Sequence, residues 1–214
     1  MSQMRENRGV ALPSFSALLG SLMRRPETNS TKNALLWGVA WLIVSALWGW
    51  HLHMAPVSAV GYDLYGYLPL LWHIVVNVAL GTTFVVPFII AAAFVNRKVS
   101  VAEAFARMLF AHWPAVLLLL PAAFVAPVNY SMLNNDLVAA FGANAAMAIS
   151  FAVLLVVVVV WMVRWCYIAF RKVVQRGGAE VLMAFGAALC ISALATSKIL
   201  EVLYRVLLNG WIWS

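Results

Sequence analysis

The sequence predicts an all-α fold, a polytopic membrane helix bundle with five transmembrane helices and an N-terminal interfacial amphipathic helix. Two observations carry this prediction. Of the 214 residues, 65% are hydrophobic and 10% are charged, against roughly 45–50% and about 25% in soluble domains. Five separate stretches are also apolar over the roughly 20 residues that a helix needs to cross the hydrocarbon core. We therefore expect one membrane domain whose surface is covered mostly by lipid.

Residues 1–33 form the expected cytoplasmic N-terminal segment. Within it, the stretch SFSALLGSLMRR at 14–25 repeats apolar residues at helical spacing and ends in two arginines. This stretch is too short to span a bilayer, so we expect an amphipathic helix that lies in the membrane interface. The segment has no long apolar region followed by a cleavage site, which predicts that no signal peptide is removed.

The transmembrane domain follows the N-terminal segment. It is expected over 34–208, with spans at about 34–54, 68–95, 101–125, 143–170 and 180–208 and an outer tail at 209–214. Pro87 and Pro114 each remove a backbone donor from a span, so we expect kinks there. The third span begins with SVAE, a capping box in which Ser100 and Glu103 satisfy free N–H groups.

The basic residues predict the topology. Twelve of the fourteen Lys and Arg residues lie before the first span or at the junctions of spans two and three and of spans four and five. The loops after spans one and three contain neither residue. The positive-inside rule then gives a cytoplasmic N-terminus and an outer C-terminus. Since topology accounts for the net charge of +7, we expect contacts with the lipid bilayer and its anionic headgroups and no nucleic-acid partner.

The motif DLYG at 63–66 resembles the Yip1 family of small membrane proteins, whose members carry Asp-Leu-aromatic or small-Gly at the head of the second helix. The proline of AHWPAVLLLL and the basic, glycine-containing turn of FRKVVQRGGAEVLMAFGAAL are also similar to that family. Here Tyr67 follows Gly66 where the family often has proline, and the proline comes later, at Pro69. The resemblance implies five spans with the N-terminus inside. The short basic N-terminal segment is similar to bacterial relatives, which implies the bacterial inner membrane.

Polar residues around the second span are the first candidate site. His73 and Asn77 are four residues apart and share a helix face, and polar side chains in a membrane favour the interior of a bundle. One interpretation is a polar cavity with Asp63 and His112, as a small transporter or channel would need. The other is an interhelical hydrogen bond worth roughly 0.6–2 kcal/mol. The sequence leaves both open.

The outer loop before the second span supplies a second group of candidates. Asp63 is expected to cap the second helix. Three aromatic residues are expected to anchor the outer interface: Tyr62, Tyr65 and Tyr67. His51 and His53 precede this loop, but no convincing third and fourth ligand accompany them and Asp63, as zinc would require. We therefore predict no metal site and no cofactor.

Two sets of charged residues are spaced as ion pairs on their helices: Glu103 with Arg107, and Lys198 with Glu201 and Arg205. Measured from the start of the last span, Lys198 lies about 27 Å along a helix that rises about 1.5 Å per residue. This position is close to the outer interface. We expect the charges to pair or snorkel at the membrane surfaces, the alternative being a buried ion-coupled triad on the last span.

No enzyme is predicted, because the sequence contains no HExxH, GxSxG, phosphate-binding glycine loop or CxxC. We expect a non-catalytic scaffold or accessory subunit that packs its helices against other membrane proteins or against itself. Small residues in the last span would let a partner helix approach closely: Ala184, Gly186, Ala187, Ala188, Ser192 and Ala195. The alternative is that this face packs within the chain.

Overall fold

The computed structural model describes residues 30–52, 54–56, 62–64, 69–118 and 145–212. Their elements, in chain order, are α2 (Thr31–His51), β1 (Met54–Pro56), β2 (Tyr62–Leu64), α3 (Leu70–Val95), α4 (Val101–Ala111), the 3-10 helix η1 (Trp113–Leu118), α8 (Ala145–Val174) and α9 (Ala179–Ile212). The amphipathic helix expected at 14–25 falls outside these ranges, as do His53, Tyr65 and Tyr67.

Four of the described helices are long and apolar enough to cross a membrane. They are α2, α3, the Ala152–Val174 part of α8 and the Ala179–Val206 part of α9. This confirms the prediction of a helical, multi-pass membrane protein. α9 has 34 residues, so at about 1.5 Å per residue it is about 51 Å long and exceeds the roughly 30 Å hydrocarbon core.

The third expected span differs from the prediction. The sequence predicts one continuous helix over 101–125, but the α-helix ends at Ala111 and a 3-10 helix begins at Trp113. Pro114 explains the break, because proline has no N–H for the carbonyl four residues earlier and disfavours helical dihedrals in the residue before it. The expected kink is therefore a change of helix type. The rest of this span lies beyond the described part of the chain.

Serine side chains cap the N-termini of two helices. Ser30 Oγ accepts a hydrogen bond from the backbone N–H of Asn33 at 3.2 Å, and Ser100 Oγ accepts one from the N–H of Glu103 at 3.3 Å. These bonds satisfy N–H groups that have no partner inside the helix. The second half of the expected capping box does not form, because the Glu103 carboxylate binds Arg107 instead.

The loop between α2 and α3 contains a short antiparallel ribbon. β1 and β2 pair with Ala55 opposite Asp63 and Pro56 opposite Tyr62. The sequence predicts that Asp63 caps the second helix, but the N-cap of α3 is Pro69, which makes no side-chain hydrogen bond. This corrects the prediction: Asp63 belongs to a strand, and proline, whose φ is already helical, begins α3.

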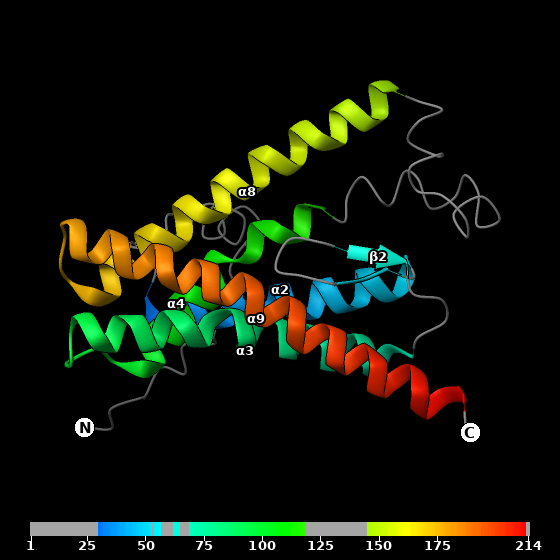
Figure 1. Cartoon of the computed structure of the whole chain (residues 1–214), viewed down its shortest axis with the longest axis horizontal. Coiled ribbons are helices and arrows are strands. Elements are labelled where there is room, and N and C mark those ends of the chain that lie inside the picture. The colour runs from blue at the N-terminus through cyan, green and yellow to red at the C-terminus, as the bar shows by residue number, and fades with distance from the viewer. Residues whose placement is uncertain (1–29, 53, 57–61, 65–68, 119–144, 213–214) are drawn as a thin grey trace, which may run out of the picture.

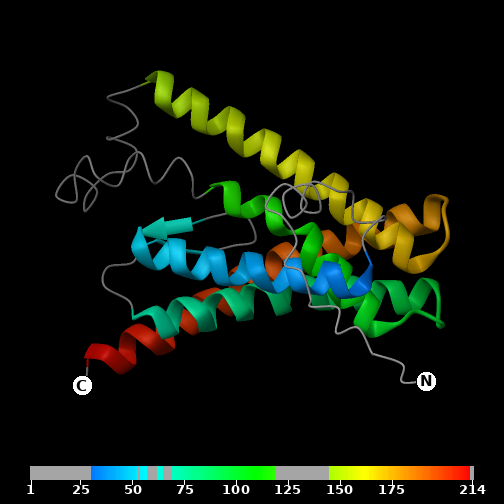
Figure 2. The same cartoon turned by 180° about the vertical axis from the view of Figure 1, so that it is seen from behind.

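The basic turns gather at one end of the bundle. Figures 1 and 2 place the start of α2, the α3–α4 turn and the α8–α9 turn at this end, and the β ribbon and the end of α9 at the other. We call the first the basic end. Its described basic residues are Lys32, Arg97, Lys98, Arg171, Lys172 and Arg176.

α3 is the central helix. α9 packs along it most extensively, and α2 and α4 also pack against it and against one another. Phe88 of α3 meets Phe170 of α8 and Phe185 of α9, with ring centroids 6.2 and 5.6 Å apart. α8 and α9 make few contacts with one another, and the first residues of α8 lie away from the other helices (Figure 1).

Reciprocal hydrogen bonds join the α3–α4 and α8–α9 turns. Asn96, the C-cap of α3, donates from Nδ2 to the carbonyl of Val174 at the end of α8, at 3.0 Å. Arg176 donates from Nη1 to the carbonyl of Val95 at the end of α3, also at 3.0 Å. Each side chain satisfies a terminal carbonyl that has no donor within its own helix. The two turns are thereby held side by side.

Candidate functional site

The polar residues of α3 take part in an interhelical hydrogen bond. Asn77 Oδ1 accepts from Ser45 Oγ of α2 at 2.8 Å, and Asn77 Nδ2 donates to the carbonyl of His73, one turn earlier, at 2.8 Å. All three residues are buried, with no more than 1% of their surface exposed. The oxygen and the nitrogen of the Asn77 amide are thus both bonded inside the bundle.

His112 is packed between aromatic rings. Its ring stacks on Phe84 with centroids 4.2 Å apart and meets Trp41 edge-on at 5.0 Å. Trp41 Nε1 also donates to the carbonyl of Leu109 at 2.7 Å, which gives this oxygen at the end of α4 a second donor beside the N–H of His112. The end of α4 is therefore held by α2 and α3 through one indole and two ring contacts.

Two cavities of the described structure can be compared with the expected polar cavity. The structure has a cavity of about 490 Å³ at the basic end and one of about 320 Å³ between α2 and α3. His73, Asn77 and His112 line neither. Asp63 lies in β2, in the loop beyond α2. The hydrogen bond between Ser45 and Asn77 favours the interhelical-bond interpretation for Asn77, and the polar cavity stays a prediction.

A second polar contact lies where Pro87 interrupts the backbone bonding of α3. Ser192 Oγ of α9 donates to the carbonyl of Phe84 at 2.7 Å, and Thr196 Oγ1 donates to the carbonyl of Ser192 at 2.6 Å. Pro87 has no N–H for the carbonyl of Thr83, the residue before Phe84. The Ser192 bond therefore joins α9 to α3 one carbonyl beyond the one that Pro87 leaves without a helical donor.

Both expected sets of ion pairs form. Arg107 Nε lies 2.8 Å from Glu103 Oε1, and the Arg107 side chain is 7% exposed. Glu201 accepts from Lys198, at 2.9 Å, and from Arg205. These three side chains are 41–79% exposed, so the set on α9 is not a buried ion-coupled triad. Arg107 is more deeply buried than an interfacial pair implies.

Candidate metal ligands are sparse. No three His, Cys, Asp or Glu residues of the described part of the chain come close enough to hold a metal ion. His51 is the last residue of α2, and its ring lies 6.1 Å from that of Trp48. Tyr62 lies in β2, and its expected role as an interfacial anchor stays a prediction.

The small residues of α9 divide between two faces. Ala188 and Ser192 are buried in the core, and Ala184 is partly buried against it. Ala187 is exposed, and an added Cβ at Gly186 would meet nothing within 4 Å. Ala188 and Ser192 therefore serve packing within the chain and are not available to a partner helix.

The cavity at the basic end is a site that the sequence interpretation missed. Tyr167, Arg171 and Lys172 of α8 and Arg176 of the turn are among its lining residues. The signal in the sequence is the run RKVVQRGG, which by itself indicates the topology and belongs to the resemblance to the Yip1 family. The structure shows in addition that these cationic residues line the same cavity.

Comparison with protein-family models, with curated proteins and with solved structures finds no match for this chain. The resemblance to the Yip1 family therefore stays a prediction, carried by DLYG and the features of the later spans.

Proposed function

We propose that the chain is a non-catalytic integral membrane protein that acts as a scaffold or accessory subunit by packing its helices against another membrane protein. The observation that carries this proposal is the packed interior. Ser45, Asn77 and His112 bond or stack inside the bundle and line no described cavity. A transporter or channel needs polar groups on a solvated path, so the alternative function has no support from these residues.

A groove between α2 and α3 supplies the docking surface in this proposal. It has a volume of about 320 Å³, and Leu109 and Phe105 of α4 are among its lining residues. The rest of its lining is apolar except for Thr82, which is exposed. Both helices that border the groove are long enough to cross the membrane, so the groove lies at the depth of the hydrocarbon core.

Thr82 favours a partner helix over a lipid chain as the occupant. Its hydroxyl makes no hydrogen bond to any residue that the structure describes. An acyl chain offers no acceptor, whereas a transmembrane helix can bring a polar side chain to this position. We therefore assign the groove to one transmembrane helix of a second membrane protein, seated as a helix in a groove.

Five crossings are part of the proposal. α4 begins at the basic end, and α8 begins at the opposite end (Figures 1 and 2). The chain between them must therefore pass from one end of the bundle to the other, which supports a crossing within 101–144. With the basic end in the cytoplasm, the N-terminus is inside and the C-terminus outside, as expected for a Yip1-like protein of the bacterial inner membrane.

Gentle detergent extraction followed by mass spectrometry tests whether a stoichiometric membrane partner exists. Photocrosslinking then locates its contact. A photoreactive residue at Val78, which lines the groove, is compared with one at Phe94, which is 85% exposed on the same helix. We expect a protein adduct at Val78, absent at Phe94 and reduced about 3- to 20-fold by Thr82→Val, the effect of one interhelical hydrogen bond.

Two results would contradict the proposal. Lipid adducts alone at Val78 and Phe94 would mean that the groove holds acyl chains. In liposomes, solute or ion flux that disappears on Asn77→Leu would restore the transport hypothesis. Absence of flux together with a Thr82-dependent adduct is the result we expect.

A further inference from the structure

The cavity of about 490 Å³ at the basic end carries an inference beyond helix packing. Arg171 and Lys172, from the last turn of α8, and Arg176, from the α8–α9 turn, give it three cationic side chains. Tyr167 and Ile168, one turn deeper on α8, form its apolar wall. A polar, cationic opening above an apolar wall matches the profile of the membrane surface.

The cavity has no counterion of its own. No carboxylate lines it, and Arg171 and Lys172 form no ion pair with any residue that the structure describes. Glu180, in the first turn of α9, is exposed and lies outside the lining. Three like charges around one hollow repel one another, and a bound anion would relieve that repulsion.

The turn that carries these cations is held in place. Arg176 bonds the carbonyl of Val95 through Nη1, and the Asn96 bond to α8 described above holds the second side. Arg171 Nε and Nη2 both lie 3.8 Å from the position that a Cβ of Gly177 would occupy. The Arg171 guanidinium therefore packs over the turn, with a planar fork suited to bidentate contact with phosphate.

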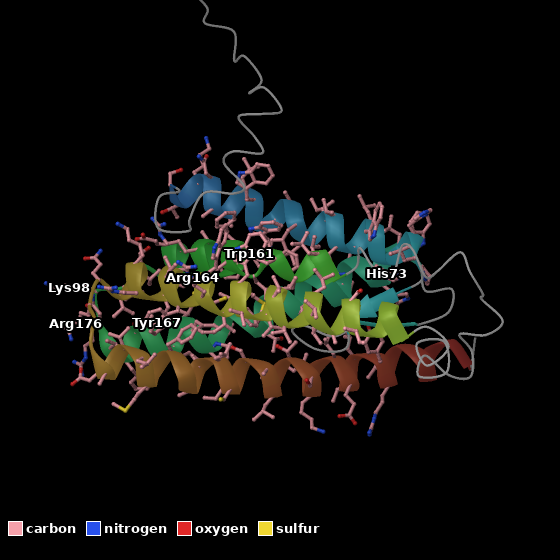
Figure 3. The ribbon with its side chains drawn as sticks, turned by 90° about the horizontal axis from the view of Figure 1, so that it is seen from above. His73, Lys98, Trp161, Arg164, Tyr167 and Arg176 are labelled. Atoms are coloured by element: carbon pink, nitrogen blue, oxygen red, sulfur yellow. The ribbon has the colours of Figure 1, made fainter. Side chains whose placement is uncertain are left out.

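Arg164 extends the cationic surface along α8. It is exposed, lies inside the span Ala152–Val174 and pairs with no described side chain. It precedes Arg171 by two helical turns on the same face, which places it about 10 Å deeper. A guanidinium at that depth is costly unless it snorkels toward the surface. Figure 3 shows Arg164 along α8 from Arg176, which lies with Lys98 at the basic end.

We propose that this cavity binds a phosphate-bearing anion at the membrane surface. Arg171 and Lys172 contact the phosphate. Arg176 holds the turn through its bond to Val95, and its positive charge also attracts the anion. Arg164 extends toward the phosphate from deeper in the membrane. A phospholipid headgroup fits this arrangement because its acyl chain would follow Ile168 and the exposed valines of α8. A free phosphate would share the same polar contacts without the apolar ones.

The test is binding of dihexanoyl phosphatidylglycerol to the full-length protein in maltoside micelles, measured by calorimetry. The variant Arg171→Gln/Lys172→Gln removes two cations from the cavity. The matched control, Arg97→Gln/Lys98→Gln, removes two exposed cations from the same end outside the cavity. Two cationic contacts predict a Kd about 30-fold weaker in the cavity variant and a change below about 3-fold in the control, which alters only screened surface charge.

Parallel titrations with dihexanoyl phosphatidylcholine and with inorganic phosphate separate the sources of the anion. Phosphatidylglycerol binding that is lost in the cavity variant, without phosphate binding, identifies an anionic lipid site. Inorganic phosphate binding with the same variant dependence identifies a free-phosphate site, and both results support the proposal. Equal weakening by both variants, or equal affinity for phosphatidylcholine with no phosphate binding, overturns it. Thermal unfolding in lipid-free micelles separates a merely structural role, which would lower the Tm of the cavity variant there as well.

Discussion

The inward and outward faces of α3 both carry large apolar side chains but make different contacts. Phe84 is 1% exposed and stacks on His112, whereas Phe94 on the same helix is 85% exposed. In a soluble protein, hydrophobicity alone would separate two such faces. Lipid is as apolar as a side chain, so in a membrane the apolar residues can face either way.

Polar and small residues are what distinguish the two faces. Ser45, Asn77, Ser192 and Thr196 are all buried, and the side chain of each forms a hydrogen bond inside the bundle, where lipid offers no partner. The exposed face of α3 instead carries branched aliphatic side chains such as those of Val78, Val86 and Ile90. The comparison teaches that packing and bonding, and not transfer from water, specify the interior of this protein. Four pairs of variants test it.

The pair Phe84→Ala and Phe94→Ala should show the largest difference. Phe84→Ala leaves a cavity and removes the stacking on His112, so we expect a loss of about 3 kcal/mol in the free energy of unfolding. Phe94→Ala removes a ring that faces lipid and should cost less than about 0.5 kcal/mol. Reversible unfolding in mixed detergent and SDS micelles measures both. Equal losses would mean that the two faces are not distinct.

The two ion pairs provide the next comparison. Glu103→Gln leaves the Arg107 guanidinium, which is 7% exposed, without its carboxylate, so we expect a loss of about 1.5–3 kcal/mol. Glu201→Gln removes the centre of an exposed network and should leave the unfolding midpoint unchanged, since exposed pairs contribute little. The same SDS titration reports both. A larger effect of Glu201→Gln would mean that the network of Lys198, Glu201 and Arg205 is buried in a contact with another protein.

Two glycines test close packing. A Cβ at Gly38 would lie 2.9 Å from Leu109 Cγ, whereas one at Gly186 would meet nothing within 4 Å. Gly38→Ala should cost about 1 kcal/mol through overpacking, and Gly186→Ala should be neutral or stabilise α9 by up to about 1 kcal/mol. The Gly38→Ala penalty should shrink in a Leu109→Ala background, because the clash is with that side chain. A penalty independent of Leu109 would contradict the assigned contact.

The smallest effect is the coupling between Ser45 and Asn77. A double-mutant cycle with Ser45→Ala and Asn77→Ala should give a coupling energy of about 0.6 kcal/mol, the average for interhelical hydrogen bonds in a membrane. Ser197→Ala serves as the control partner for Asn77→Ala, since Ser197 bonds its own helix at the carbonyl of Ala193. A coupling energy of zero between Ser45 and Asn77 would mean that this hydrogen bond does not stabilise the interior.

Several features of the fold could be predicted from local sequence. Long apolar runs identify α2, α3, α8 and α9, and SVAE predicts the serine cap at the start of α4. The spacing of Glu103 and Arg107, and of Lys198, Glu201 and Arg205, predicts pairs that the structure contains. These predictions succeed because they depend on contacts within one or two turns of a helix.

Other features depend on contacts between helices. His73 and Asn77 share a face, but whether that face lines water or packs on α2 depends on Ser45, which is distant in the sequence. The position of Asp63 depends on strand pairing. The end of α4 depends on Trp41 of another helix, which donates a hydrogen bond to the carbonyl of Leu109. Periodicity carries little information about such contacts in α2 and α3, because neither helix has one distinctly polar face.

The sequence by itself determined that this protein belongs in a membrane, roughly where its four long apolar helices lie, and that its basic residues gather at one end. Membrane insertion and orientation depend on the length, hydrophobicity and charge of each segment, which are properties of the local sequence. The tertiary structure alone decided which polar groups are bonded inside and which cations share the cavity beside the α8–α9 turn. The reason is physical: in lipid, an interior is specified by the few side chains that bond or fit closely across helices, and those pairs form only when the helices pack.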